Sequence, residues 1–281
     1  MSQVRFTKMH GIGNDYIYIN CFEQDIQNPN ELAKKMSPRR FSVGADGVIL
    51  ICPSQVADAK MRMFNLDGSE GKMCGNGIRC VGKFVFDSGI AHKSTVTIET
   101  LSGIKTLEIT EKDGKAVSVR VDMGKAELAP RKIPVLLDGD KIINKPITVA
   151  DKQYNITAVS MGNPHAVVFC DDVDGLVLEK IGPDFEHHAI FPEQVNTEFI
   201  RVIDEKSLQM RVWERGSGET FACGTGACAA VVAAVENGFC KRDCEITVHL
   251  VGGDLCITYT ADGTVYMRGG AEKVYDAVYE Y

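Results

Sequence analysis

The chain has 281 residues, of which 44% are hydrophobic and 25% charged, and its formal net charge is -7. This length predicts two domains, and this composition is typical of a soluble globular protein. The negative charge argues against nucleic acid or an anionic membrane as the main partner. No apolar run approaches the roughly 20 residues of a membrane-spanning helix, and the N-terminal residues lack a signal-peptide core. We therefore predict a cytoplasmic protein that does not bind a membrane.

The ten cysteines have to be assigned to disulfides, to metal or to other roles. A disulfide scaffold is typically short and secreted, which this chain is not. The close cysteine pairs are Cys74-x5-Cys80, Cys223-x4-Cys228 and Cys240-x3-Cys244. None of them has the C-x2-C spacing of structural zinc, so we predict no metal site. Most cysteines are interpreted as small buried hydrophobes, and Cys74 and Cys223 are the exceptions.

The first half of the chain contains short β-branched runs that predict strands. In chain order these are YIYIN (16–20), GVILIC (47–52), KMRMF (60–64) and TVTIET (95–100). Between the last two runs, NGIRCVGKFVFDSG (76–89) keeps its polar residues on one stripe, which predicts an amphipathic helix. This helix begins directly after Cys74, and Gly89 is well placed as its C-terminal cap.

The second half repeats this order of elements. Its strand-like runs are AVVF (166–169), EFIRVI (198–203), LQMRVW (208–213) and EITVHL (245–250). The segment TGACAAVVAAVENG (225–238) is apolar nearly all round, which predicts a helix buried on every side. It begins after Cys223 and ends at Gly238. Each half is therefore interpreted as a twisted sheet wrapped around one helix, an α/β (α+β) fold.

A shift of 149 residues superimposes the two halves of the sequence. Cys74, Gly75 and Gly77 fall on Cys223, Gly224 and Gly226; MRMF (61–64) falls on MRVW (210–213), Glu70 on Glu219, and Gly13-Asn14 on Gly162-Asn163. Because one offset holds over most of each half and includes residues outside turns, we predict two homologous, pseudo-symmetric domains. Their expected ranges are 1–123, completed by the C-terminal strand 269–281, and 124–268.

A cysteine at a helix start has a particular chemistry. The helix N-terminus offers unpaired N–H groups and a partial positive charge, which can lower the pKa of a thiol below its usual 8.5. The glycines after each cysteine let the same N–H groups approach a carboxylate. Two such sites sharing one substrate favour a two-base racemase or epimerase, in which one thiolate removes the α-proton and the opposite thiol delivers one. His165 in GNPH and Glu214 in WERGSGET are the titratable candidates for controlling both protonation states.

Six ordered blocks identify a family that the chain resembles. KMHGIGNDY, GADGVIL, FNLDGSEGKMCGNGIRC, GNPHAVVF, VNTEFI and WERGSGETFACGTGACA together are similar to diaminopimelate epimerases over nearly the whole chain. The resemblance implies two pseudo-symmetric α/β domains, each a mostly antiparallel sheet around a central helix. It implies an isomerase of lysine and peptidoglycan precursor biosynthesis that interconverts LL- and meso-2,6-diaminopimelate without pyridoxal phosphate or metal. It also implies a homodimer.

Carried over by motif, the resemblance makes Cys74 and Cys223 the acid and base, with His165 and Glu214 managing their protons. It implies substrate contacts from Asn14, Asn65, Gly75, Asn76, Asn163, Asn196, Glu214, Arg215, Gly224 and Thr225. Diaminopimelate has an ammonium and a carboxylate at each end. Arg215 suits the distal carboxylate, and Glu214 can accept from the distal ammonium.

One position departs from the family pattern, and other functions stay open. Some members carry glutamine where this chain has Gly47, so that side-chain contact is missing here. A proline racemase or hydroxyproline epimerase has the same fold, but typically carries histidine after the first Cys-Gly, where this chain has Asn76. A thiol redox protein is the alternative from another class, because two low-pKa cysteines can form a reversible disulfide. A binding protein without catalysis is the third.

Overall fold

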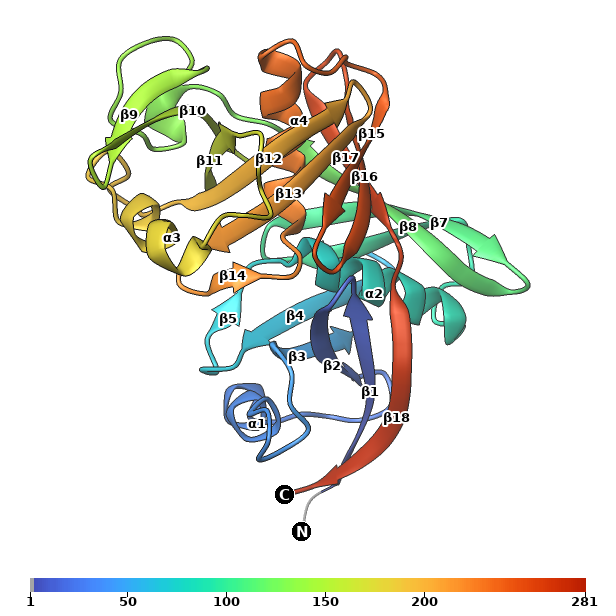
Figure 1. Ribbon diagram of the computed structural model, residues 1–281. Coiled ribbons are helices and arrows are strands. Elements are labelled where there is room, and N and C mark those ends of the chain that lie inside the picture. The colour runs from blue at the N-terminus through green and yellow to red at the C-terminus, as the bar shows by residue number, and fades with distance from the viewer. Residues whose placement is uncertain (1–2) are drawn as a thin grey trace. The chain divides into compact units, whose positions relative to one another are not determined.

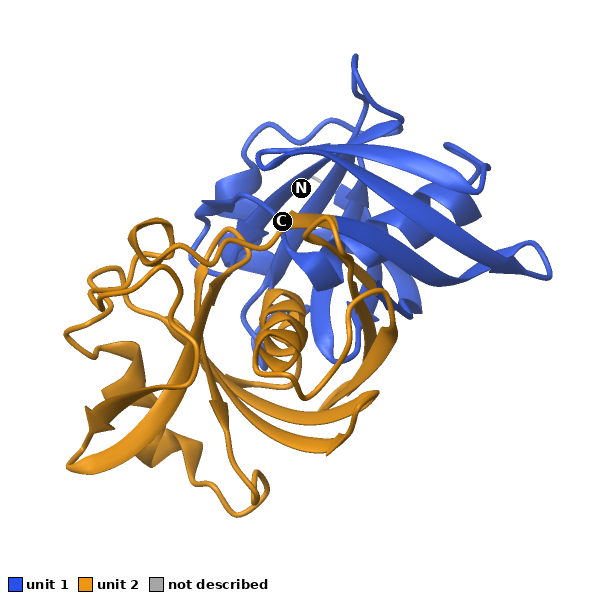
Figure 2. Ribbon diagram, turned by 90° about the horizontal axis from the view of Figure 1, so that it is seen from above, with its two compact units in different colours: residues 1–122, 268–281 blue, residues 123–267 orange. Residues whose placement is uncertain are grey.

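The protein is described by a computed structural model that covers residues 3–281 (Figure 1). The chain forms two compact units, coloured separately in Figure 2. Unit 1 consists of Met1–Asp122 with Arg268–Tyr281, and unit 2 of Met123–Met267. The ranges expected from the repeat differ from these by one residue at each boundary.

Unit 1 is one mixed sheet with two helices. Its strands are β1 (Gln3–Gly11), β2 (Asn14–Asn20), β3 (Gly47–Cys52), β4 (Ala59–Asn65), β5 (Glu70–Gly71), β6 (Thr95–Thr100), β7 (Gly103–Lys112), β8 (Lys115–Lys125) and β18 (Glu272–Glu280), and its helices are α1 (Pro29–Met36) and α2 (Gly75–Asp87). The strands pair in the order β18-β1-β2-β3-β4-β6-β7-β8, with β5 on β4. Among these pairs, β2–β3 and β4–β6 are parallel and the others antiparallel. The C-terminal strand β18 thus pairs with the N-terminal strand.

Unit 2 has the same plan. Its elements are η1 (Pro130–Lys132), β9 (Lys145–Val149), β10 (Lys152–Ser160), β11 (Pro164–Phe169), α3 (Leu178–Glu186), β12 (Asn196–Asp204), β13 (Ser207–Glu214), β14 (Gly218–Thr220), α4 (Gly224–Glu236), β15 (Glu245–Leu250), β16 (Gly253–Tyr259) and β17 (Thr264–Gly269). Pairing runs β9-β10-β11-β12-β13-β15-β16, with β14 on β13. The parallel pairs are β11–β12 and β13–β15, the equivalents of those in unit 1.

The repeat in the sequence is a repeat of structure inside each unit. Helix α4 begins and ends 149 residues after α2, and β10 begins and ends 149 residues after β1. The strand register is conserved as well, since Tyr16 lies opposite Gly47 in unit 1 and His165 lies opposite Asn196 in unit 2. Residues that fall on one another in the shifted sequence therefore occupy equivalent places in their own units.

The two central helices end as the sequence predicts. Gly89 and Gly238 follow them with φ of +78° and +80°, a conformation in which glycine avoids the strain of a Cβ. The Gly238 N–H donates to the Val235 carbonyl, and the next N–H, of Phe239, donates to that of Ala234. This closes the last turn of α4 in a Schellman pattern.

The surroundings of α4 explain its unusual composition. Ten of its thirteen residues are buried, and the strands of unit 2 curve around it (Figure 2). Small residues, mostly alanine and valine, let the sheet approach the helix closely. Helix α2 keeps a more polar stripe, where Lys83 forms an ion pair with Asp87. The prediction of an all-apolar buried helix in the second half is confirmed.

Candidate active site

Both central helices begin in the same way, at a cysteine. Cys74 is the N-cap of α2, and its sulfur accepts the Gly77 N–H at 3.3 Å. Cys223 is the N-cap of α4, and its sulfur accepts the Gly226 N–H at 3.3 Å. The first turn of each helix carries no acidic residue of its own. Each unit thus presents a thiol beside a helix terminus suited to an anion.

In unit 1, Cys74 lies next to an uncharged amide. Its thiol donates to Asn14 Oδ1 at 3.2 Å, and Asn14 Nδ2 donates to Asp46 Oδ2 at 2.7 Å. Arg39 also binds Asp46, at 2.8 Å, so this carboxylate is already paired. The hydrogen bonds hold the Asn14 side chain in a fixed orientation against the sulfur.

Tyr16 is a titratable side chain on the Cys74 side of unit 1. It is buried, and burial together with the nearby Cys74 raises its pKa well above the usual value. Its hydroxyl therefore stays protonated and acts only as a hydrogen-bonding group.

Two of the predicted substrate-binding asparagines lie in unit 1 with their side chains hydrogen-bonded. Asn65, at the end of β4, donates to Ser69 Oγ at 3.0 Å. Asn76 Oδ1 accepts from Arg79 Nη1 at 2.9 Å.

In unit 2, the residue equivalent to Tyr16 is His165, and it forms a buried pair with a carboxylate. His165 Nδ1 lies 2.7 Å from Glu198 Oε1, and neither side chain is exposed to solvent. His165 Nε2 lies 3.1 Å from Asn163 Oδ1. Asn163 Nδ2 in turn donates to Thr225 Oγ1 at 3.4 Å, and that hydroxyl is 3.6 Å from the sulfur of Cys223. The histidine is thereby connected to the start of α4.

Glu214 is the second acidic group beside Cys223. Its carboxylate accepts a short hydrogen bond from Thr220. Burial raises the pKa of Glu214, and the negative charge of Glu198 raises it further, while the bonds from Thr220 and Cys223 lower it. The sequence singles out His165 and Glu214, and both lie on the Cys223 side of their unit.

One sequence-based expectation is wrong. The helix start predicts a lowered pKa for its cysteine, yet the pKa of Cys223 is raised well above the usual value. Burial is the largest cause, and the carboxylates of Glu214 and Glu198 add to it. The hydrogen bonds with Thr225 and Gly226 lower the pKa but are weaker. Cys223 is therefore a thiol at neutral pH, which suits a proton donor.

Asn196 and Arg215 lie in contact with each other. Asn196 is buried, donates to the Pro164 carbonyl at 2.9 Å and accepts from the Arg215 N–H at 3.0 Å. Arg215 is exposed, and its guanidinium donates to the Glu193 carbonyl at 2.8 Å. Its position in the turn after β13 leaves the charged group available to a carboxylate.

Gly47 occupies the place in unit 1 that Asn196 occupies in unit 2. A Cβ at Gly47 would come within 2.1 Å of the Phe64 carbonyl oxygen, so no side chain fits there with this backbone. Glutamine at this position would need β3 and β4 to move apart. The absence of that contact is thus built into the packing of this chain.

Sequence reasoning missed Glu198, Asp46 and Tyr16. Two signals could have found the first and the last of these. Glu198 stands two residues after Asn196 in a strand, and such residues share one face of the sheet. Tyr16 falls on His165 in the shifted sequence. The strand period and the repeat therefore each indicate one of these positions from the sequence alone.

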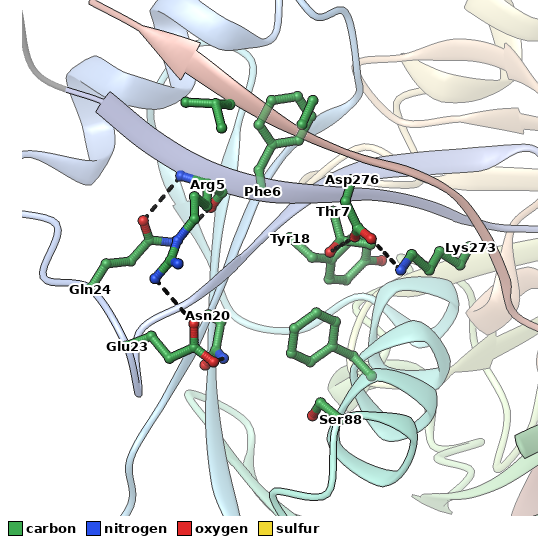
Figure 3. Close-up of a pocket in the computed structure, with 13 residues that line it drawn as sticks. Arg5, Phe6, Thr7, Tyr18, Asn20, Glu23, Gln24, Ser88, Lys273 and Asp276 are labelled. Atoms are coloured by element: carbon green, nitrogen blue, oxygen red, sulfur yellow. Dashed lines mark hydrogen bonds and ion pairs between the residues drawn. The ribbon is translucent and has the colours of Figure 1, made fainter. Parts of the chain in front are cut away.

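The described residues contain other features that do not involve the cysteines. A cavity of about 480 Å³ in unit 1 is lined by β1, β2, α2 and β18. Figure 3 shows that its charged groups already form ion pairs, Arg5 with Glu23 and Asp276 with Lys273.

Within residues 3–281 no group of three or more His, Cys, Asp or Glu is placed to hold a metal ion. No helix in that range is long and apolar enough to cross a bilayer.

Comparison with known families decides between the functions left open by the sequence. The family model "Diaminopimelate epimerase" matches residues 6–129 and 157–274. The chain belongs to the diaminopimelate epimerase family. The model spans both cysteines and all the sequence-predicted site residues, from Asn14 to Thr225.

Curated members of this family are similar over nearly their full length. A diaminopimelate epimerase of Acetivibrio thermocellus is 57% identical, with 97% of each chain covered. One of Methanococcus maripaludis is 55% identical over 97% of this chain and 98% of its own. One of Bacillus cytotoxicus is 54% identical over 100% of this chain and 99% of its own. The recognition made from the six sequence blocks is confirmed, and the protein is an isomerase.

Solved structures establish the fold independently. A PhzF-family protein of Bacillus anthracis matches with a TM-score of 0.70 and 16% identity, covering 100% of both chains. A probable proline racemase of Agrobacterium radiobacter matches with a TM-score of 0.71 and 14% identity, covering 98% of this chain and 92% of its own. These identities are too low to transfer activity, but they confirm the expected fold class of the diaminopimelate epimerase family.

Proposed function

We propose that the protein interconverts LL- and meso-2,6-diaminopimelate by a two-base mechanism in which Cys74 and Cys223 act on opposite faces of the α-carbon. The observation that carries this proposal is the duplicated helix start: one thiol in each unit, capping its helix in the same geometry. Membership of the family supplies the substrate. The reaction requires both units, because each contributes one of the two proton-transfer groups.

The proton balance of this reaction is simple. One sulfur, as thiolate, takes the α-hydrogen as a proton and becomes a thiol, while the opposite thiol gives its proton to the carbanion carbon and becomes a thiolate. No atom other than hydrogen changes place, and no redox partner is needed. The raised pKa of Cys223 keeps that sulfur protonated before the substrate reacts, which suits it to deliver a proton. The orientation of the bound substrate decides which stereoisomer forms when Cys223 donates its proton.

The α-carboxylate is proposed to bind the two helix starts. Gly75-Asn76 and Gly224-Thr225 supply N–H groups whose dipoles stabilise the charge that develops on the carboxylate as the proton leaves. This stabilisation matters because the α-hydrogen of an amino acid is a weak acid. The protein would need no pyridoxal phosphate and no metal for the step.

Polar side chains are proposed to bind the distal end of the substrate. Arg215 would bind the distal carboxylate with its planar fork of donors, and Glu214 would accept from the distal ammonium. The amides of Asn14, Asn65, Asn163 and Asn196 would complete the contacts. Polar groups left unpaired by a shorter amino acid would make it a poor substrate.

A deuterium-exchange experiment tests the function. Reduced protein is incubated with LL-diaminopimelate in deuterated water, and both epimerisation and α-deuteration are followed by proton NMR and chiral chromatography. We expect both, with proline and hydroxyproline unchanged and Cys223→Ser greatly slowed. Reduced protein that neither exchanges nor epimerises diaminopimelate, but cycles thiols with a dithiol reductant, would show a redox protein instead.

The proposal extends to the setting of the enzyme. It would act in the cytoplasm, in lysine and peptidoglycan precursor biosynthesis, as a homodimer. Sedimentation equilibrium of the purified protein tests the dimer: a species of 30.7 kDa, the mass of one chain, at all concentrations contradicts it. The α-deuteration assay is run without pyridoxal phosphate or added metal. Deuteration under these conditions is the result expected of an enzyme that needs no cofactor.

A further inference from the structure

Glu198 is a buried carboxylate that the two-base mechanism does not use. Its side chain, on β12, is 0% exposed, and its Oε1 lies 2.7 Å from His165 Nδ1. Its other oxygen, Oε2, has no hydrogen-bond partner among residues 3–281. Burying a carboxylate costs several kcal/mol even when it is paired. A group retained at that cost with one oxygen unsatisfied points to a role beyond packing.

The fold itself does not require a carboxylate at this place. The equivalent residue in unit 1 is Ile49, on β3. A Cβ added at Gly226 would lie 2.6 Å from Glu198 Oε1, and one added at Gly77 would lie 2.8 Å from Ile49 Cδ1. The two side chains therefore fill the same space against the first turn of their helices. Because isoleucine satisfies this space in unit 1, the charge in unit 2 needs a separate explanation.

The contacts of His165 supply that explanation. A carboxylate oxygen only accepts hydrogen bonds, so at 2.7 Å it requires a hydrogen on Nδ1. The ring is then fixed with Nε2 toward Asn163, whose amide leads to Thr225 and the start of α4. Asn163 Oδ1 also only accepts, so the hydrogen that Nε2 gains or loses points to Asn163. A neutral histidine with its hydrogen on Nε2 could not accept a proton there, and a free ring would not keep Nε2 in place.

We propose that Glu198 is a positioning residue for the reaction, which holds the hydrogen of His165 on Nδ1 and turns Nε2 toward the start of α4. This inference rests on the proposed function. Glu198 does not touch the reacting atoms; it acts through His165, much as a buried carboxylate orients the histidine of a catalytic triad.

The charge of Glu198 has a second effect, on the thiol. The titratable groups around it are His165 from β11, Glu214 from β13 and Cys223 at the start of α4. Its negative charge disfavours the thiolate of Cys223 and so contributes to the raised pKa of that thiol, after burial and Glu214. Removing the charge should lower the pKa of Cys223. The alkaline limb of the kcat/KM profile should then move to lower pH.

Two variants separate the hydrogen bond from the charge. Glu198→Gln keeps an acceptor oxygen but removes the charge, and Glu198→Ile installs the side chain that unit 1 carries. Glu236→Gln is the matched control: Glu236 is also a largely buried, paired carboxylate of unit 2, bound to Lys141 at 2.7 Å and Arg242 at 2.6 Å, at the far end of α4. All three are made in the full chain.

The first measurement is independent of turnover. Nitrogen-15 NMR of histidine-labelled protein, with the His165 signals assigned by His165→Asn, reports which ring nitrogen carries the hydrogen. We expect a protonated Nδ1 in the wild type and in Glu236→Gln, and a changed tautomer distribution in Glu198→Ile. This readout judges Glu198 even if diaminopimelate is not the substrate, so its failure and that of the proposed function are distinguishable.

The second measurement is the pH dependence of epimerisation. We expect kcat/KM to fall on the order of 10-fold in Glu198→Gln and 100-fold in Glu198→Ile. The alkaline limb should shift to lower pH in both, whereas Glu236→Gln should match the wild type. Unchanged His165 nitrogen shifts in Glu198→Ile, or an unmoved alkaline limb in Glu198→Gln, overturn the proposal. If Glu198→Ile does not fold, the alkaline limb of Glu198→Gln decides.

Discussion

The positions around Cys74 carry Tyr16, Ile49 and Asn65, whereas the equivalent positions around Cys223 carry His165, Glu198 and Glu214. The backbone is the same in both units, down to the register of the strands and the 3.3 Å bond that caps each sulfur. The side chains differ in charge. At these three positions unit 1 carries side chains that stay neutral, and unit 2 carries an acid-base cluster.

Under the proposed mechanism, this difference lets one fold supply two unlike groups for proton transfer. A pair of identical thiols would have equal affinities for a proton, and nothing would decide which one begins as the acid. Burial and two carboxylates raise the pKa of Cys223, which keeps that sulfur protonated. The asymmetry therefore lies in three side chains and not in the duplicated backbone.

The largest expected effect comes from removing either thiol. Cys74→Ala and Cys223→Ala should each lower kcat/KM for epimerisation by about 10³-fold or more, and the double variant should be little worse, because the two sulfurs act as a unit. Steady-state kinetics measures this. Cys80→Ala and Cys228→Ala remove buried thiols one turn or more into each helix and should stay within a few-fold of the wild type. Comparable losses in these controls contradict a special role for the helix-start thiols.

The next largest effect is expected from giving unit 1 the charge of unit 2. Ile49→Glu buries a carboxylate at a fully buried site, in a unit where Tyr16 occupies the place equivalent to His165. We expect a destabilisation of about 3 to 5 kcal/mol in urea unfolding, as for an unpaired buried charge. Ile49→Val is the control, with an expected loss of about 1 kcal/mol. Equal losses in the two variants would mean that unit 1 tolerates the charge and that the asymmetry has no energetic basis.

A smaller effect should distinguish the two equivalent arginines. Arg62 binds Glu70 and Arg211 binds Glu219, at 2.8 and 2.7 Å. Arg211 also donates to the carbonyls of Val173, Asp174 and Leu176. Arg211→Ala should therefore destabilise by about 2 kcal/mol, because carbonyls lose a donor, and Arg62→Ala by less than about 1 kcal/mol. Urea unfolding of the two variants tests this order, and the reverse order contradicts it.

The smallest effect concerns the stability cost of Glu214. Its pKa is raised in the folded protein, so the folded state binds more protons than the unfolded state once the pH rises above the usual pKa of 4.5. Stability is therefore lost as the pH rises from that value through the raised folded pKa. Glu214→Gln removes the titration and should show a higher Tm than the wild type at pH 8, with the difference shrinking at pH 4. A Tm difference that is independent of pH contradicts this sign.

Much of the fold could be predicted because local signals and the repeat agree. The glycines at 89 and 238 mark where each helix ends, and the apolar composition of α4 marks it as buried on all sides. Cys74 and Cys223 are recognisable as helix starts from the same pattern. The interaction of Arg211 with Glu219 also follows from the repeat once that of Arg62 with Glu70 is known.

The rest of the site could not be predicted, because it depends on contacts between segments far apart in the chain. His165 and Glu198 are 33 residues apart and meet only because β11 and β12 pair in parallel. The sequence predicts a lowered pKa for Cys223 because it shows only the helix start, which is a local effect. Burial beneath the sheet and the charges of two carboxylates raise this pKa. These tertiary effects outweigh the local one.

The sequence by itself determined the duplication, the two helix starts and the identity of the thiols, since these depend on short-range patterns that recur 149 residues apart. The tertiary structure decided the protonation of Cys223 and the orientation of His165. Both depend on how much water remains around a group and on which charges lie within a few ångströms of it. Those quantities arise only when the strands of unit 2 have closed around α4.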